Sequence, residues 1–154
     1  MNLESALLWM FIGSLVIGIY LNGMNVLADD FSHLYFSSPT LIYSAVLMAS
    51  LMSILEVIMH YNHVGEFNTK YLVVFLVLAI LMVYSLREQV LIGDKEWLKR
   101  MISHHSTAIT TSKKIKDKTN NKRLKNLASS IIEQQLDEID DMEDMLNNIY
   151  DAKV

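Results

Sequence analysis

Residues 71–105 read YLVVFLVLAILMVYSLREQVLIGDKEWLKRMISHH, and the change of character within this stretch decides the fold. Its first half is apolar and carries no charge before Arg87, whereas its second half alternates charged and apolar residues at helical spacing. Gly93 interrupts the apolar run, and Asp94 is a good N-cap for a new helix. We therefore expect a membrane domain at residues 1–92 and a water-soluble domain at residues 93–154.

The composition agrees with a chain made of two unlike parts. It is 52% hydrophobic, which is too apolar for an ordinary soluble domain, and 12 of its 13 Lys and Arg residues lie at Arg87 or later. One Pro and five Gly residues leave little turn chemistry for a β fold, so the long periodic stretches predict an all-α protein. The absence of Cys excludes disulfides and thiolate zinc sites. A net charge of -4 gives no support for nucleic-acid binding.

Three segments are long and apolar enough to cross a bilayer as helices. A span needs about 20 apolar residues, because the hydrocarbon core is roughly 30 Å thick and a helix rises about 1.5 Å per residue. Residues 6–27, 41–59 and 71–86 meet this requirement. Val26 and Ala28 before Asp29 form a passable signal-peptide cleavage pattern, but the first run is long and lacks a basic start, which favours a membrane anchor.

The charges flanking these spans give two opposite orientations. Arg87, Lys95 and the neighbouring basic residues place the soluble part in the cytoplasm by the positive-inside rule. Asp29 in the first loop and Lys70 in the second indicate the reverse, and large terminal segments cross membranes largely regardless of their charge. The residues alone therefore leave the topology open.

The second span carries polar and sulfur-containing residues on one helical face. They are spaced by four, four, four and three positions: Met48, Met52, Glu56, His60 and His63. A carboxylate and imidazoles at membrane depth are costly unless they face protein, water or an ion. We read this face either as a possible second metal site or as a packing feature in which Glu56 pairs with His60 or with a neighbouring helix.

The soluble part reads as an antiparallel helical hairpin with a turn near residue 119. The expected helices cover residues 94–116 and 121–149. Their expected core stripes are Trp97, Met101, His104 or His105, Ala108, Ser112 and Ile115 on the first helix, and Leu124, Ala128, Ile131, Gln135, Glu138, Met142, Met145 and Ile149 on the second. This register brings together Met101, His104, His105, Gln135, Glu138 and Met142. Polar residues at core positions need hydrogen-bond partners or a shared ion.

The stretch Met101-Ile-Ser-His104-His105-Ser-Thr-Ala108-Ile109, followed by Gln135, Glu138 and Met142, resembles a bacterial family of unknown function with a ferritin-like helical fold. Some soluble members of that family bind copper in the periplasm. A three-span membrane-anchored subgroup is similar to this chain throughout, including the first-loop sequence Phe31-Ser-His33-Leu-Tyr35-Phe36-Ser37. The resemblance implies a multi-pass inner-membrane protein with an extracytoplasmic hairpin that is half of a ferritin-like four-helix bundle.

Two departures from the family pattern have consequences. This chain has Thr111 at a position where the pattern of the copper-binding members has Met, so the resemblance implies one soft ligand fewer. The three-span subgroup tolerates Thr at that position. The soluble copper binders carry two hairpins in one chain, whereas this chain has one. A four-helix bundle would therefore require a homodimer or a higher oligomer.

Two functional hypotheses follow. In the first, Met101, His104, His105 and Met142 bind copper, with Glu138 and Gln135 as further ligands or as groups that orient the imidazoles, in metal storage, delivery or tolerance. The metal donor or acceptor stays unidentified, and membrane lipid is the other expected partner. A di-iron oxidase is disfavoured, because neither His104 nor His105 has a Glu three residues earlier. No hydrolase, phosphate-loop or dinucleotide motif is present, so we expect a non-enzyme.

In the second hypothesis, the protein is a non-catalytic oligomerisation or interaction module, and the His, Gln and Glu cluster is a structural core network. The hairpin would then pair through its apolar stripe and through two runs of opposite charge. The basic run is Lys113, Lys114, Lys116, Lys118, Lys122, Arg123 and Lys125, and the acidic run is Asp137, Glu138, Asp140, Asp141, Glu143 and Asp144. Each run can also be a solvated face, because exposed ion pairs contribute little.

Overall fold

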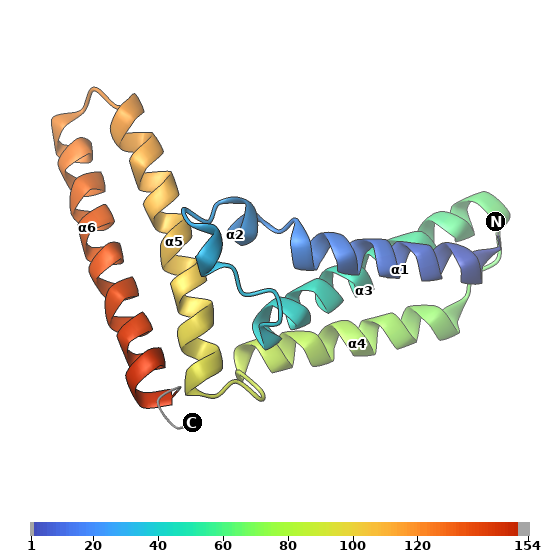
Figure 1. The fold of residues 1–154 in the computed structure, drawn as a ribbon. Helices are drawn as coiled ribbons and strands as arrows, with labels where there is room; N and C mark the ends of the chain where they lie inside the picture. The colour runs from blue at the N-terminus through green and yellow to red at the C-terminus, as the bar shows by residue number, and fades with distance from the viewer. Residues whose placement is uncertain (1, 151–154) are drawn as a thin grey trace. The chain divides into compact units, whose positions relative to one another are not determined.

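A computed structural model describes residues 2–150, with residues 149 and 150 described by their backbone alone. The described chain is all-helical and contains no strand, as predicted (Figure 1). Its α-helices are α1 (Leu3–Tyr20), α2 (Gly23–Val26), α3 (Pro39–Val64), α4 (Thr69–Arg87), α5 (Asp94–Lys118) and α6 (Lys122–Met145). A 3-10 turn, η1 (Phe31–His33), precedes α3, and a π-helical turn, η2 (Leu146–Tyr150), follows α6.

The chain divides into two compact units. The first contains residues up to Asn22 together with Pro39–Ile92, and the second contains Gly23–Ser38 together with the residues from Gly93 onward. The loop Gly23–Ser38 differs from the division expected at 1–92, because its polar groups make their hydrogen bonds with α5.

Three helical segments in the described chain are long and apolar enough to cross a membrane. They are Leu3–Val26, Pro39–Val64 and Thr69–Arg87. The first expected span, 6–27, is interrupted: α1 ends at Tyr20, and the four residues of α2 form a separate turn. Asn22 explains the break, because its side-chain amide donates to the carbonyls of Gly18 and Ile19 at 3.2 and 3.1 Å.

Helices α1 and α3 pack closely through small residues. A Cβ atom on Gly18 would lie 2.9 Å from both Cα and Cβ of Ala45, so only glycine fits at this contact. The serines of α3 satisfy their hydroxyls within the helix, as Ser53 does by donating to the Ala49 carbonyl at 2.9 Å. Phe11 of α1 stacks on Phe75 of α4, with ring centres 6.0 Å apart. These contacts join the three apolar helices, which lie side by side in Figure 1.

Helices α5 and α6 form the predicted antiparallel hairpin. The buried row of α5 is shifted by one residue from the predicted stripe, whereas Ala128 and Met142 of the predicted α6 stripe are buried as expected. The hairpin core consists of Leu98, Ile102, Ile109, Ile139, Met142 and Leu146. Trp97 and Ile115, expected in the core, are 47% and 41% exposed. The sequence contains two apolar stripes on α5, one residue apart, and α6 covers the second of them.

The ends of the hairpin helices also differ slightly from the predicted ends. Gly93, and not Asp94, occupies the N-cap position of α5, and no side chain caps this end. Asp94 lies in the first turn, where a carboxylate interacts favourably with the helix dipole. At the turn between the helices, Asn121 caps α6 by accepting from the backbone N–H groups of Arg123 and Leu124 at 2.9 and 3.2 Å.

Candidate functional site

His105 lies at the contact between α5 and α6 because it follows the buried stripe of α5. It comes three residues after Ile102 and four before Ile109, which places all three side chains on the face toward α6. Its side chain is only 14% exposed. On α6, Gln135 precedes the buried Ile139 by four residues and is partly buried. The pattern of the two stripes therefore positions one imidazole against one short polar segment of α6.

Glu138 joins these two side chains. Its Oε2 lies 2.9 Å from Nδ1 of His105 and accepts a hydrogen bond from the Gln135 amide at 3.2 Å. Gln134, which was not among the predicted site residues, donates to Oε1 of the same carboxylate at 2.9 Å. The His105 Nδ1 is close to the carboxylate but is not aligned as a hydrogen bond, and it has no other polar partner in the described chain. Two amides and one imidazole thus converge on a single carboxylate.

Burial controls the protonation of His105. Desolvation lowers the pKa of this imidazole below its ordinary value, the neighbouring His104 lowers it further, and the Glu138 carboxylate acts in the opposite direction. The neutral ring is therefore favoured at neutral pH. A neutral imidazole has a free lone pair, which is the form that binds metals.

The remaining residues of the expected hairpin site differ in how deeply they are buried. His104 is exposed, and its ring centre lies 5.9 Å from that of His105 at an angle of 63°. Met101 is partly buried beside the hydrophobic core, and Met142 is buried within it. In the described part of the chain, no three His, Asp or Glu side chains are grouped closely enough to hold a metal ion. The structure thus brings His105, Glu138 and Gln135 into contact, with His104 beside them.

The residues of the second expected site, on α3, make fewer contacts with one another than those of the hairpin site. The buried side of α3 carries Leu41, Ala45, Ala49, Ser50, Ser53 and Val57, so the expected face lies beside the packed one. Its residues are partly buried (Met48, Glu56, His60) or exposed (Met52, His63). No hydrogen bond or ion pair joins Glu56 to His60 in the described chain, and the His63 Nδ1 contacts the Met59 carbonyl at 2.8 Å.

The loop Gly23–Ser38 covers the side of α5 that carries two buried serines. The Ser106 hydroxyl accepts from the Asp29 backbone N–H at 2.8 Å and contacts the His33 Nδ1 at 2.9 Å. Ser103 donates to the His33 carbonyl. The Asp29 carboxylate lies 2.6 Å from the Lys113 ammonium and accepts from Thr110 at 3.3 Å. These contacts join residues 70 or more positions apart in the sequence and fix the loop on the helix.

His33 also approaches α6. Its Nε2 lies 3.8 Å from Oε1 of Glu143, so Ser106, His33 and Glu143 follow one another in the order of a hydrolytic triad. Ser106 is fully buried and its oxygen already accepts from Asp29, so no substrate can reach it as a nucleophile. The arrangement therefore holds the loop between the two helices and positions the His33 ring.

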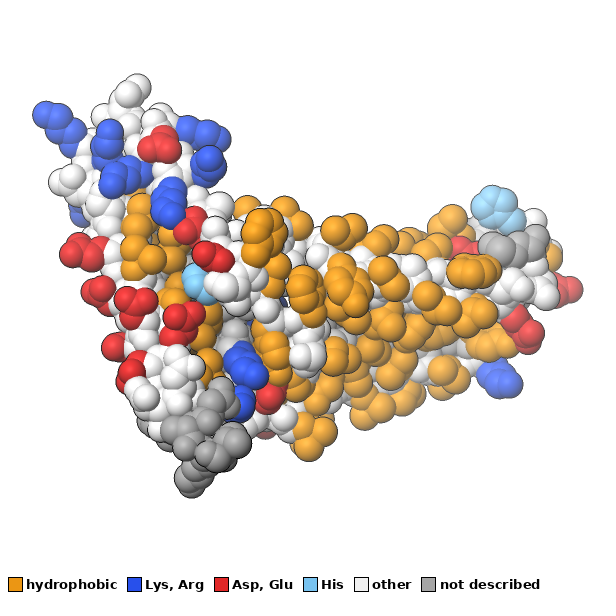
Figure 2. Space-filling view, viewed as in Figure 1, with side chains coloured by type: hydrophobic (Ala, Val, Ile, Leu, Met, Phe, Trp, Pro, Cys, Tyr) orange, Lys and Arg blue, Asp and Glu red, His pale blue; other side chains and the backbone are white. Residues whose placement is uncertain are grey.

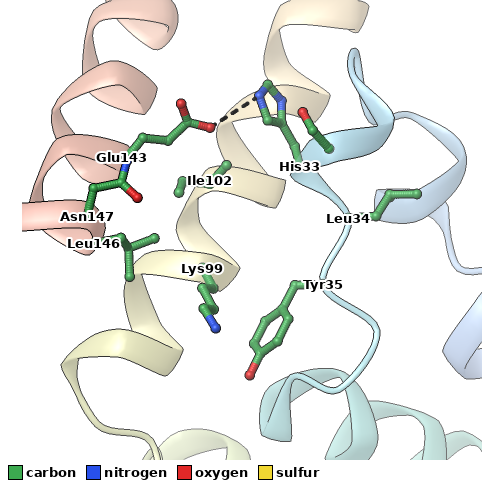
Figure 3. A pocket seen from close by; sticks show the side chains of 9 residues that line it. His33, Leu34, Tyr35, Lys99, Ile102, Glu143, Leu146 and Asn147 are labelled. Carbon is green, nitrogen blue, oxygen red and sulfur yellow. Dashed lines mark ion pairs between the residues drawn. The ribbon is translucent and has the colours of Figure 1, made fainter. Parts of the chain in front are cut away.

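An open pocket of about 470 Å³ lies beside His33 and is shown in Figure 3. His33 and Glu143 point toward each other across it, and Lys99 faces Tyr35, with its ammonium 5.2 Å from the centre of the ring. The Tyr35 hydroxyl donates to Glu96. Burial and this contact with a carboxylate raise the pKa of Tyr35 above its ordinary value. The lining combines both signs of charge with apolar side chains.

Comparison with known proteins places the hairpin in a family. Residues 85–146 match a domain of unknown function, DUF305. The chain is also 37% identical over 144 residues to the uncharacterized protein L153 of Acanthamoeba polyphaga mimivirus, which covers 94% of this chain and 93% of that protein. The chain belongs to the DUF305 family. No solved structure matches it.

The extent of these matches separates two parts of this DUF305 protein. The domain match begins near the end of α4 and includes α5 and α6, so His104, His105 and Glu138 lie within it. The similarity to the viral protein extends over nearly the whole chain and so includes the apolar helices and the loop that covers α5. The family match thus lies on the hairpin, whereas the similarity to the viral protein also covers the part of this chain that contains the three apolar helices.

Ser103, Ser106 and Gln134 help to organise this DUF305 hairpin but were not among the residues predicted from the sequence. Ser103 and Ser106 are spaced as one helical face, and this spacing was the available signal. Serines on a helix are ordinarily read as solvent-exposed, and nothing in their local sequence indicates that a distant loop covers them. His33 had been noted only as part of the first-loop pattern.

Proposed function

We propose that this DUF305 protein is a membrane-anchored metal-binding protein and that its metal is copper. The observation that carries the proposal is the buried His105 imidazole, kept neutral by desolvation and placed 2.9 Å from the Glu138 carboxylate with His104 beside it. Two imidazoles and a carboxylate with a nearby thioether, Met101, form a donor set suited to a soft or borderline metal. Side-chain rotations of His104 and Glu138, both partly accessible, would complete the ligand set.

The chemistry of the donors favours copper over hard cations. Thioether sulfur selects Cu(I), and imidazole suits both oxidation states of copper. Met142 would serve as a second soft ligand from α6, while Gln135 and Gln134 orient the Glu138 carboxylate through their amide hydrogen bonds. When bound, the metal would be stored, passed on or kept from harmful reactions, and the protein would not act as an enzyme.

The α3 face is proposed as a second, weaker site. It offers two thioethers, a carboxylate and two imidazoles along one helix, Met48, Met52, Glu56, His60 and His63. Ionisable groups in a membrane span are costly, which favours a role for them beyond packing. Because this face lies beside the packed side of α3, an ion would have to bridge neighbouring turns of the helix.

A structural network is the second candidate function for the hairpin cluster. Gln134 and Gln135 both donate to Glu138, so the carboxylate already has partners without an ion. On this reading the cluster fixes the register of α5 on α6 and has no ligand. The two functions differ in whether copper is bound stoichiometrically.

Copper titration separates the two functions. The full-length protein, purified without chelator in detergent, is titrated with Cu(I) in competition with a chromogenic chelator. We expect His104→Ala combined with His105→Ala to weaken Cu(I) binding by at least about tenfold. The matched control, His60→Ala with His63→Ala, removes the same number of imidazoles from α3, so it should weaken only the second, weaker site and leave the tighter binding at the hairpin unchanged. Unchanged binding in the hairpin double variant, with folding verified by circular dichroism, would exclude the hairpin site.

The location of the site is proposed to be extracytoplasmic, on an inner membrane. The acidic first loop and Lys70 of the second loop support this orientation, as does the family resemblance. Asn120 lies exposed in the turn between α5 and α6, and the protein has no native Cys. We expect Asn120→Cys to react with an impermeant maleimide in intact cells. Labelling only after lysis would reverse the orientation.

A further inference from the structure

One long side of the hairpin carries exposed apolar side chains. Trp97 and Ile115 of α5 are 47% and 41% exposed, and Leu127 and Met145 of α6 are 55% and 44% exposed. Each lies on the side of its helix that faces away from the loop Gly23–Ser38. We call this the open side. It also carries Met101, Ala108, Leu124 and Ile131. A row of apolar residues exposed to water on a folded hairpin is typical of an interaction surface.

The two ends of the hairpin have opposite charge. Around the turn lie the seven basic residues of the run that begins at Lys113 and ends at Lys125, with Asp117 between them. Toward the other end, α6 carries six acidic residues between Asp137 and Asp144 and no basic one. Figure 2 shows this separation, with blue side chains gathered near the turn and red ones farther along the hairpin. At that end α5 carries Lys95, Lys99 and Arg100 beside Asp94 and Glu96, so α6 carries most of the charge separation along the hairpin.

We propose that the open side binds the same side of a second copy of this chain, with the two hairpins antiparallel. In this dimer, a two-fold axis places the basic end of each hairpin beside the acidic end of the other. A parallel dimer would place like charges together and is disfavoured for that reason. Trp97 of one copy then lies level with Ile115 of the second copy, and His104 of each copy lies near the axis.

The size of the open side is sufficient for such a dimer. Helices of 25 and 24 residues are each about 36 Å long at a rise of about 1.5 Å per residue. Two helices packed side by side, each about 9 Å wide, make this side about 18 Å wide. Its area is therefore roughly 650 Å² per copy. The total of roughly 1,300 Å² lies within the range of specific protein interfaces, about 1,200 to 2,000 Å².

The dimer does not rest on metal binding. The apolar residues of the open side and the opposite charges at its two ends are properties of the metal-free hairpin. If copper binds at His104 and His105, the axis brings a second pair of imidazoles near the first. The experiments below are therefore done with a chelator present, so that loss of the dimer and loss of copper binding are separate results.

A pair of matched leucine substitutions tests the surface. Leu127 and Leu136 are both exposed on α6, and nine residues place them half a turn apart, on opposite sides of the helix. We expect Leu127→Asp to raise the dimer dissociation constant of the full-length protein at least about tenfold, because it buries a charge in the contact. Leu136→Asp should change it less than twofold. The measurement is subunit counting by single-molecule photobleaching in lipid nanodiscs with chelator.

Cysteine cross-linking tests the orientation, because the protein has no native Cys. Trp97→Cys and Ile115→Cys are expressed together and treated with a short bis-maleimide. The antiparallel dimer predicts cross-links between the two variants and none when Ile115→Cys is expressed alone. Self-cross-linking of Ile115→Cys would indicate a parallel dimer and overturn the proposal. It would equally be overturned by a monomer in nanodiscs, or by a dimer that forms no Trp97–Ile115 cross-link and survives Leu127→Asp.

A charge exchange provides an independent check. Arg123 and Asp141 both flank the open side, one at each end of α6. Arg123→Glu alone and Asp141→Arg alone each place two like-charge pairs in the dimer, so each should raise the dissociation constant about fivefold or more. The two variants mixed together should dimerise as the unaltered chain does. Lys125→Glu, with the same charge change on the other side of α6, is the control, and equal effects of Lys125→Glu and Arg123→Glu would contradict the antiparallel contact.

Discussion

The two long sides of α5 have opposite environments. On one side Ser103 and Ser106 are fully buried under the loop Gly23–Ser38, while on the other side Trp97 and Ile115 are exposed. From hydrophobicity alone, the side with Trp97 and Ile115 would be expected to be buried and the side with the two serines to be exposed. The buried side is small and polar, so the backbone of the loop can approach and donate its N–H groups to the helix. Burial on this helix therefore follows hydrogen-bond complementarity as well as apolar area.

The largest effect is expected on the covered side, for Ser106→Val. The substitution leaves the Asp29 N–H and the His33 Nδ1 without their hydroxyl partner and adds a methyl group in a fully buried position. We expect the free energy of unfolding of the hairpin to fall by about 3 kcal/mol. The measurement is denaturant unfolding followed by Trp97 fluorescence in a Trp9→Phe background, because the chain has only these two tryptophans.

A loss below about 1 kcal/mol would mean that the loop is not held through Ser106. In that case the covered side would be equivalent to an ordinary solvated helix face. Ser106→Ala, which removes the hydroxyl without adding bulk, separates the lost hydrogen bonds from the steric effect of Val.

A smaller effect on the same side is expected for Asp29→Ala. The Asp29 carboxylate lies 2.6 Å from the Lys113 ammonium and accepts from Thr110 at 3.3 Å, but Lys113 is exposed and Thr110 is only partly buried. We expect a loss of about 1 kcal/mol, reduced by salt because the pair is screened by water and ions. A double-mutant cycle with Lys113→Ala measures the interaction, and additive effects of the two substitutions would show that the ion pair contributes nothing.

The sequence predicted the features that depend on local patterns. Hydropathy located three apolar helices, and the interruption at Gly93 located the start of the hairpin within one residue. The antiparallel register placed His105 opposite Gln135 and Glu138, and the structure brings these three side chains together. Such features follow from residue spacing along single helices and from one short turn.

Features that depend on distant partners were not predictable. The bond between the Asp29 N–H and Ser106 joins residues 77 positions apart, and no local pattern marks either of them. The core stripe of α5 was displaced by one residue because Trp97 and Leu98 each begin an apolar row at helical spacing. Only the position of α6 determines which row is buried. Likewise, the spacing of Glu56 and His60 placed them on one face without indicating what they contact.

His105 lies at the edge of the buried contact between α5 and α6, and its protonation makes the stability of the hairpin depend on pH. Burial lowers its pKa, so below the ordinary value of 6.5 the unfolded chain takes up a proton that the folded chain excludes. The unfolded state then binds more protons, and the stability of the hairpin is expected to fall as the pH decreases from about 7 toward 5. Trp97-detected unfolding across this range measures the slope, and His105→Gln should flatten it. An unchanged slope in that variant would assign the pH dependence to another group.

The smallest effect is expected on the open side, for Thr111→Val. This substitution replaces a hydroxyl with a methyl group of similar volume. Unlike the buried hydroxyl of Ser106, the Thr111 hydroxyl is exposed to solvent. The Thr111 hydroxyl is exposed and contacts only the carbonyls of Thr107 and Ala108 within its own helix, at 3.1 Å each. Removing it leaves both carbonyls in their helical hydrogen bonds, so we expect a change within about 0.5 kcal/mol in protein diluted below the dimer dissociation constant. A loss as large as that of Ser106→Val would show that the open side is covered within the monomer, and the distinction between the two sides of α5 would be lost.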